Sequence, residues 1–187
     1  MKGMSLISLA DKATIKKIFF GGAVVSWCIT IFLLSAENAD ESSMTSGGLI
    51  RHMLELFVPD FLTNTEAERL QMINELQFYV RKAAHFTAYL ILGFLATQVF
   101  LAIPKLKTVK RMCIGAWLFS VVYAISDEVH QSFVPGRAMQ LRDVCIDSSG
   151  ALLGVVLSYL VSKAVYDHYE RLKNKPAPPK STDNTEE

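Results

Sequence analysis

Apolar segments alternate with polar ones along the whole chain. They span about residues 18–34, 83–103, 112–131 and 144–161, although the third is continuously apolar only as far as Ile125. A helix needs about 20 mostly apolar residues to cross the hydrocarbon core of a bilayer. The pattern therefore predicts an all-α, polytopic membrane protein with four transmembrane helices.

The first apolar segment could also be a cleaved signal peptide, because Lys16 and Lys17 stand immediately before it. A signal peptide ends in a small-x-small cleavage site, and the sequence Leu33-Leu34-Ser35-Ala36-Glu37 offers a poor one. We therefore expect an uncleaved signal anchor that remains as the first span.

The segment 35–80 between the first two spans is predicted to be helical rather than a separate domain. Four of its apolar residues recur at the spacing of a short amphipathic helix near the membrane surface: Leu49, Met53, Leu54 and Phe57. Pro59 interrupts this helix, and Thr63 with Glu66 offers a capping box for another. Because the apolar pattern then continues into the second span, we expect one long helix whose first turns stand outside the bilayer.

Composition excludes two other classes of protein. Hydrophobic residues make up 51% of the chain, charged residues 20%, and the mean hydropathy is +0.28, which is too apolar for a disordered protein. The 19 Lys+Arg nearly balance the 18 Asp+Glu, so nucleic acid is not an expected partner.

The distribution of charge predicts the orientation of the chain. Three segments contain most of the basic residues: the terminal segments 1–17 and 162–187 and the loop 104–111. Together they hold 13 Lys and Arg but only 6 acidic residues, whereas the rest of the chain holds 6 Lys and Arg and 12 acidic residues. Under the positive-inside rule both termini and this loop are cytoplasmic. The segment 35–80 is then extracytoplasmic. The Pro-rich end of the 162–187 tail is predicted to be disordered.

Ionisable residues at the start of the second span need an explanation, because charges within a membrane helix are costly. Spacings of four residues place Arg81, His85 and Tyr89 on one helical face, beside Lys82. Snorkelling to lipid headgroups would account for Arg81 and Lys82. His85 lies about 6 Å deeper, where snorkelling is harder.

The third and fourth spans also carry polar residues, at the ends that would lie on the same side of the membrane as the start of the second span. The third ends in a polar run that an ordinary loop would also explain: Asp127, Glu128, His130 and Gln131. Pro135 and Gly136 then make a turn that presents Arg137. The fourth span carries one helical stripe made of Asp143, Asp147, Gly150 and Gly154. The two glycines permit close helix packing, which would allow these acids simply to pair with Arg81 or Lys82.

Under the predicted topology, all three polar clusters lie at the outer ends of their helices. We therefore predict that they converge in one extracytoplasmic pocket at the headgroup boundary. Its predicted ligand-binding residues are Arg81, Lys82, His85, Tyr89, Asp127, Glu128, Gln131, Arg137, Asp143 and Asp147.

Two motifs resemble signatures of the VanZ-like family. One is Arg81-Lys82-Ala83-Ala84-His85-Phe86-x-x-Tyr89-x-x-Leu92-Gly93-Phe94. The other is Ser126-Asp127-Glu128-x-x-Gln131-x-Phe133-Val134-Pro135-Gly136-Arg137, followed by Asp143-Val144-x-x-Asp147-x-x-Gly150-x-x-x-Gly154. The resemblance covers about residues 80–155. It implies a multi-pass protein of the bacterial cytoplasmic membrane, associated with teicoplanin resistance, and it leaves the biochemical activity open.

Three functions remain open. In the first, Arg81, Lys82 and Arg137 bind an anionic lipid headgroup, lipid-linked wall precursor or wall polymer. In the second, the chain is a metal-dependent hydrolase or transferase acting on an envelope lipid or phosphodiester, with His85, Asp127 and Glu128 as catalytic candidates. Its divalent cation would be held among Asp127, Glu128, His130, Asp143 and Asp147. The third is a transporter, for which four spans are few, so that it would need a homo-oligomer.

The predicted topology is tested by labelling single cysteines, introduced into a cysteine-free variant, with a membrane-impermeant reagent. Positions in 35–80 and 132–142 should react from outside in intact cells, and positions in 104–111 should react only after lysis. The reverse pattern would contradict the orientation that the loop charges predict.

Overall fold

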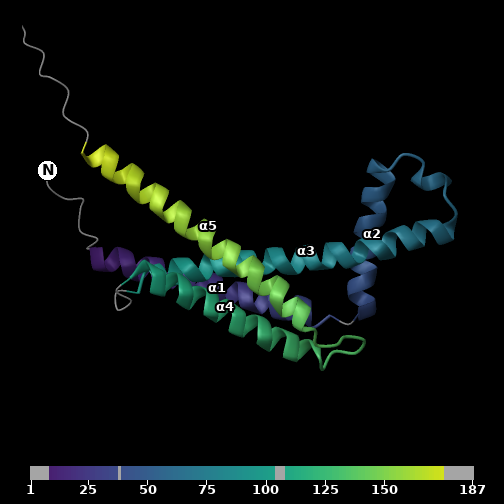
Figure 1. Ribbon diagram of the computed structural model, residues 1–187, viewed down its shortest axis with the longest axis horizontal. Helices are drawn as coiled ribbons and strands as arrows, with labels where there is room; N and C mark the ends of the chain where they lie inside the picture. The colour runs from purple at the N-terminus through teal and green to yellow at the C-terminus, as the bar shows by residue number, and fades with distance from the viewer. Residues whose placement is uncertain (1–8, 38, 104–107, 175–187) are drawn as a thin grey trace, which may run out of the picture.

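The computed structural model describes residues 9–37, 39–103 and 108–174. Within these ranges the chain forms five α-helices and one 3₁₀ turn (Figure 1): α1 (Leu9–Ser35), α2 (Ala39–Phe57), η1 (Phe61–Thr63), α3 (Glu66–Leu101), α4 (Val109–Gln131) and α5 (Leu141–Lys173). The predicted all-α fold is confirmed. The Pro-rich end of the tail, 175–187, and the loop residues 104–107 lie outside the described residues.

Four of these helices, α1, α3, α4 and α5, are long and apolar enough to cross a membrane. Their outer surfaces expose large apolar side chains, among them Phe19 and Ile29 on α1, Val122 on α4 and Leu160 on α5. Such a surface is unfavourable in water and is suited to contact with lipid chains. The prediction of four candidate spans is confirmed.

The helix that carries the second span begins well before the apolar segment, as predicted, but its capping box differs. The backbone N–H of Glu68 donates to Thr65 Oγ1 at 3.4 Å, and the N–H of Thr65 donates to Glu68 Oε2 at 2.9 Å. The capping box predicted at Thr63 and Glu66 is therefore wrong by two residues. Thr63 ends the 3₁₀ turn instead, where its hydroxyl donates to the carbonyl of Asp60 at 2.7 Å. One continuous helix then leads from the loop into the span.

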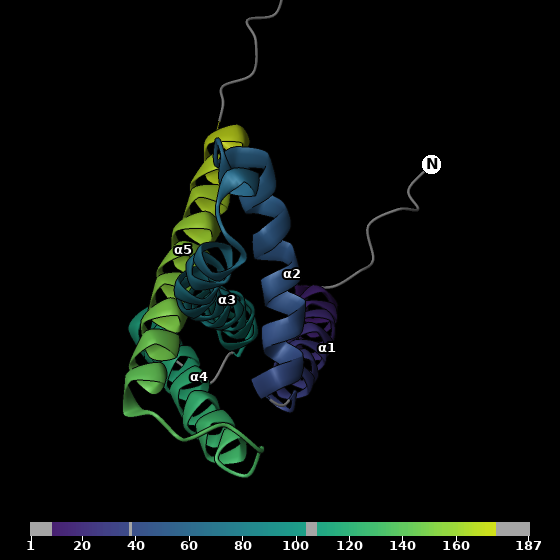
Figure 2. The ribbon, with the colours of Figure 1, turned by 90° about the vertical axis from the view of Figure 1, so that its right-hand side faces the viewer.

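The predicted amphipathic helix is α2, which crosses the part of α3 that extends beyond the other helices (Figures 1 and 2). Its buried face is formed by Ile50 and Leu54, which pack with Phe61 and Ile73. Of the four apolar residues that predicted this helix, only Leu54 is buried. The buried stripe is therefore set by contact with η1 and α3, and the remaining apolar residues face outward.

The backbones of α3 and α5 lie unusually close, because glycines line the contact. A Cβ on Gly150 would lie 2.2 Å from the carbonyl oxygen of Phe86, and one on Gly154 would lie 2.0 Å from that of Leu90. On the other helix, a Cβ on Gly93 would lie 2.2 Å from the carbonyl oxygen of Ala151. The predicted close approach at the Gly150/Gly154 stripe is confirmed.

The ends of three helices lie together at the side of the bundle from which α3 extends (Figure 1): the last turns of α1 and α4 and the first turn of α5. The connection from α4 to α5 contains a tight turn, in which the N–H of Arg137 donates to the carbonyl of Val134 at 3.1 Å. Gly136 has a φ of 77° there, as the third residue of a type II turn requires. The predicted turn at Pro135 and Gly136 is confirmed.

The close contact of α3 and α5 at the glycines predicts that adding one methyl group there strongly destabilises the fold. Gly150→Ala should lower the free energy of unfolding by at least 1–3 kcal/mol, the usual cost of overpacking a core, because the clash is with backbone. Gly21→Ala is the control, since nothing lies within 4 Å of a Cβ there. Thermal unfolding in detergent measures both. Equal stability of the two variants would contradict the close contact of α3 and α5.

Candidate functional site

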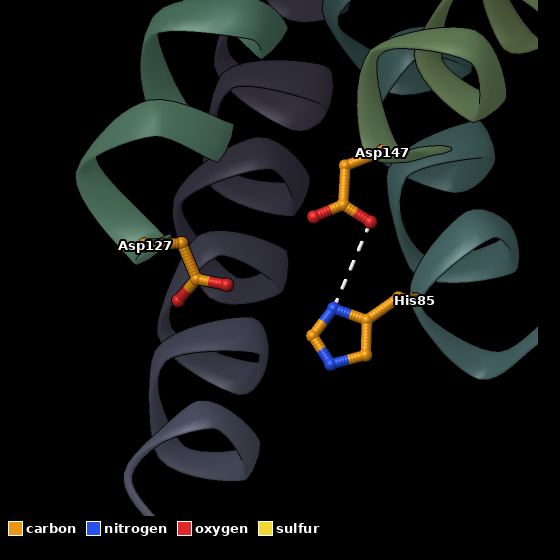
Figure 3. A group of neighbouring side chains, drawn as sticks. All are labelled: His85, Asp127 and Asp147. Carbon is orange, nitrogen blue, oxygen red and sulfur yellow. Dashed lines mark ion pairs between the residues drawn. The ribbon is translucent and has the colours of Figure 1, made fainter. Parts of the chain in front are cut away.

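His85, Asp127 and Asp147 come together from α3, α4 and α5 (Figure 3). One nitrogen or oxygen atom from each lies within 4.8 Å of the other two. Gly150 contacts the backbone at Phe86, which is the residue after His85. Asp147, about one helical turn before Gly150, is therefore brought to face the imidazole.

Asp147 is fully buried, and neither of its carboxylate oxygens accepts a hydrogen bond from the described residues. The closest charged contact is between Asp147 Oδ1 and His85 Nδ1, at 3.7 Å, which is an ion-pair distance rather than a hydrogen bond. A buried carboxylate with unused oxygens is energetically unfavourable unless a cation or donor compensates it. This is the most unusual polar group of the site.

Asp127 is held in place by two polar side chains. Ser35 Oγ donates to Asp127 Oδ2 at 2.9 Å, and Gln131 Nε2 donates to the same oxygen at 3.2 Å. The other oxygen, Oδ1, has no hydrogen-bond partner among the described residues. The carboxylate is thus oriented through one oxygen.

Ser35 was missed by sequence reasoning. It ends α1 and is buried, and α1 is brought to α3 and α4 by two hydrogen bonds: Trp27 Nε1 donates to the carbonyl of Ala88, and the Tyr123 hydroxyl donates to that of Cys28. The only sequence signal was a hydroxyl residue at the end of an apolar segment, which is too common to indicate a site.

Two other predicted site residues hold the start of α5. Glu128 is fully buried, and its Oε2 accepts the backbone N–H of Gln140 at 2.9 Å, just before α5 begins. Asp143, in the first turn of α5, forms an ion pair with Lys82 of α3. Both carboxylates lie at the N-terminus of α5, where negative charge is favourable, although Glu128 itself belongs to the C-terminal end of α4. The alternative of structural pairing is what the structure shows for Lys82 and Asp143.

Arg81 and Arg137 line two adjoining cavities at this end of the bundle. One, of about 300 Å³, is bounded mainly by apolar side chains, including Ile31, Leu34 and Ala88. The other, of about 190 Å³, is bounded mainly by polar residues. Arg81, His85 and Arg137 line both. We call the two cavities together the cleft.

The ionisation of Arg137 is affected by its burial and by the neighbouring Arg81. Burial lowers the pKa of Arg137, the positive charge of Arg81 lowers it further, and Asp127 is among the acids that oppose these effects. The cleft therefore contains two cations, and the charge of Arg81 disfavours that of Arg137.

The remaining predicted site residues lie around this centre. Tyr89 is fully buried and lines the apolar cavity, and Gln131 lines the polar one. His130 stacks on the ring of Phe32 with centroids 4.4 Å apart, and it does not belong to the group of His85, Asp127 and Asp147. Glu128 and Asp143 also lie outside that group.

The ion pair of Lys82 and Asp143 predicts a specific pattern of stability. Lys82→Met should lower the free energy of unfolding by about 3 kcal/mol, because it leaves the mostly buried carboxylate of Asp143 with only a 3.9 Å contact to the exposed Arg142. Lys82→Met/Asp143→Leu should recover most of this loss, because no uncompensated charge remains. Thermal unfolding of the two variants and of Asp143→Leu measures the coupling. Additive effects would contradict the pairing.

A comparison with protein families connects this arrangement to known proteins. The family model described as VanZ/LLP1 matches residues 20–162, which include every residue of the site described above. Searches of curated proteins and of solved structures gave no match. The resemblance seen in the two sequence motifs is confirmed over three quarters of the chain. With its four candidate spans, the chain is a multi-pass membrane protein that belongs to the VanZ/LLP1 family.

Proposed function

We propose that this protein binds an anionic amphiphile of the bacterial cell envelope in the cleft. The observation that carries the proposal is that an apolar and a polar cavity adjoin and share Arg81, His85 and Arg137. A ligand with an acidic headgroup and an apolar chain fits this arrangement, with the headgroup at the arginines. An anionic lipid or a lipid-linked wall precursor has this form, whereas a soluble wall polymer has no apolar part.

The polar cavity favours an anion for electrostatic reasons. Arginine presents a planar set of donors that can bind phosphate or carboxylate oxygens in pairs. The repulsion between Arg81 and Arg137, which contributes to the lowered pKa of Arg137, would be relieved by an anion between them. Coulombic attraction is also stronger where water is partly excluded.

The apolar cavity would bind the apolar chain of the ligand. Ile31 and Leu34 of α1 face Val80, Ala84 and Ala88 of α3 across it. An acyl or prenyl chain would gain about 25 cal/mol for each Å² of apolar surface that it buries there. Affinity for a lipid should therefore exceed affinity for its isolated headgroup.

In the proposed topology, which the loop charges support, this cleft lies at the outer face of the cytoplasmic membrane. Lipid-linked wall precursors and anionic lipid headgroups are exposed at that face. We propose that the family's association with teicoplanin resistance reflects binding of such a ligand at Arg81 and Arg137.

The proposal is tested with the purified full-length chain, by measuring binding of phosphatidylglycerol and phosphatidylcholine in detergent. Arg81→Ala/Arg137→Ala should weaken phosphatidylglycerol binding by 10-fold or more, because each charged hydrogen bond contributes about 1.5–3 kcal/mol. Arg111→Ala is the control, since Arg111 is an exposed arginine at the opposite end of α4. Glycerol phosphate should compete only weakly, because it has no apolar chain.

Two results would contradict the proposal. One is unchanged phosphatidylglycerol binding by the double variant. The other is equal binding of the two lipids by the wild-type protein, since phosphatidylcholine carries a headgroup without net charge.

A further inference from the structure

We propose that His85, Asp127 and Asp147 bind one divalent metal ion, with Zn²⁺ as the best-suited cation and Mn²⁺ as the next. This metal site shares His85 with the wall of the arginine cleft, but it does not depend on the function proposed above. It rests on the chemistry of the donor set, on the two unused oxygens of a buried carboxylate, and on the side chains that orient a second carboxylate.

The donor set suits a borderline divalent cation. An imidazole nitrogen favours Zn²⁺ and related transition metals, and carboxylate oxygens are accepted by Zn²⁺ and Mn²⁺ alike. Mg²⁺ prefers an octahedral shell of oxygens and keeps several waters, so that one histidine and two aspartates suit it less. Three protein ligands are also the usual number in zinc sites that keep a further position open.

The geometry is close to that of a metal site. The three donor atoms lie within 4.8 Å of one another, whereas ligands about 2.1 Å from a tetrahedral zinc ion lie about 3.4 Å apart. Rotation of the side chains would close this difference. Asp147 can turn toward an ion without losing a hydrogen bond, since no described residue donates to either of its oxygens.

The position of Asp147 is independent evidence for a ligand. Its carboxylate is fully buried and points toward His85 and Asp127 (Figure 3). The imidazole contact at 3.7 Å leaves both oxygens free to coordinate. A carboxylate buried in a helical bundle without hydrogen bonds is costly, and a bound cation is one of the few partners that compensates it.

Asp127 shows the outer-shell support that metal ligands usually have. Ser35 and Gln131 both donate to Oδ2, and Oδ1 has no hydrogen bond from the described residues. Hydrogen bonds to a ligating carboxylate fix its direction and are typical of metal sites. The fixed carboxylate faces the histidine and the second carboxylate (Figure 3).

A divalent ion would also balance the local charge. Asp127 and Asp147 together contribute two negative charges. Of the nearby cations, Lys82 already pairs with Asp143, and Arg137 interacts with Glu37 and Glu128 as well as with Asp127. A metal ion with a charge of two would neutralise the pair and allow His85 to coordinate in its neutral form. Because His85 also lines both cavities of the cleft, the ion would lie beside the cleft wall.

The test measures Zn²⁺ binding to tag-free, EDTA-treated, full-length protein by calorimetry and by metal analysis after dialysis. We expect one Zn²⁺ per chain, with Mn²⁺ weaker and Mg²⁺ weaker again. Asp147→Asn and His85→Gln should each bind Zn²⁺ at least 100-fold more weakly. Asp167→Asn and His168→Gln are the controls, because they change the same residue types at exposed positions near the other end of α5.

Ser35→Ala gives a second test that does not remove a ligand. As a positioning change it should weaken Zn²⁺ binding by about 10- to 100-fold while one ion is still bound per chain. Zn²⁺ should raise the unfolding temperature of the wild-type protein and have little effect on Asp147→Asn. This comparison also shows whether Asp147→Asn is folded.

Three results would overturn the metal site. They are substoichiometric Zn²⁺ in the wild-type protein, wild-type affinity in Asp147→Asn and His85→Gln, and equal losses in the two α5 controls. Arg81→Ala/Arg137→Ala should still bind one Zn²⁺ per chain, because neither arginine is a proposed ligand, and lipid binding is measured separately with EDTA present. Failure of the metal site can therefore be distinguished from failure of the lipid cleft.

Discussion

The close contact between α3 and α5 determines the arrangement of the site. Gly93, Gly150 and Gly154 place the two backbones where any larger residue would clash with a carbonyl. In lipid, such contacts stabilise helix pairs through packing rather than through the hydrophobic effect. The register that they fix sets Asp147 opposite His85 and Asp143 opposite Lys82. The polar chemistry of this protein thus depends on residues that have no side chain.

Four acids lie buried at one end of the bundle, and the structure compensates them in different ways. Glu128 accepts a backbone N–H at the start of α5, Asp143 pairs with Lys82, and Asp127 accepts from Ser35 and Gln131. Asp147 alone relies on a longer ion-pair contact to an imidazole. The first three arrangements hold helices together and leave one oxygen of each acid without a hydrogen bond from the described residues, whereas Asp147 has two such oxygens. Asp147 is therefore the acid with the most coordinating capacity left for a ligand, and Asp127 keeps one oxygen available beside it.

Much of the fold could be predicted because apolar segment length and glycine spacing are local properties. The four candidate spans, the long helix entering the second span, the Pro135–Gly136 turn and the glycine contact follow from such patterns. Exact boundaries could not be predicted in the same way: the capping box uses Thr65 rather than Thr63, since η1 occupies Thr63. The local sequence pattern also could not predict which face of α2 is buried, because contact with η1 and α3 determines that Ile50 and Leu54 are the buried residues.

The candidate site shows the same limit for tertiary contacts. Helix periodicity predicted that His85, Asp127 and Asp147 meet, because each lies near the end of α3, α4 or α5 that was expected on the same side of the membrane. Periodicity could not tell which acid has a carboxylate available for a ligand, because Glu128 and Asp147 look equivalent until the hydrogen-bond partners of each are known. Nor could it find Ser35, whose role depends on α1 packing against α3 and α4 through Trp27 and Tyr123. Helix periodicity therefore identifies which residues can meet, and the contacts between helices decide which of them remain free to bind.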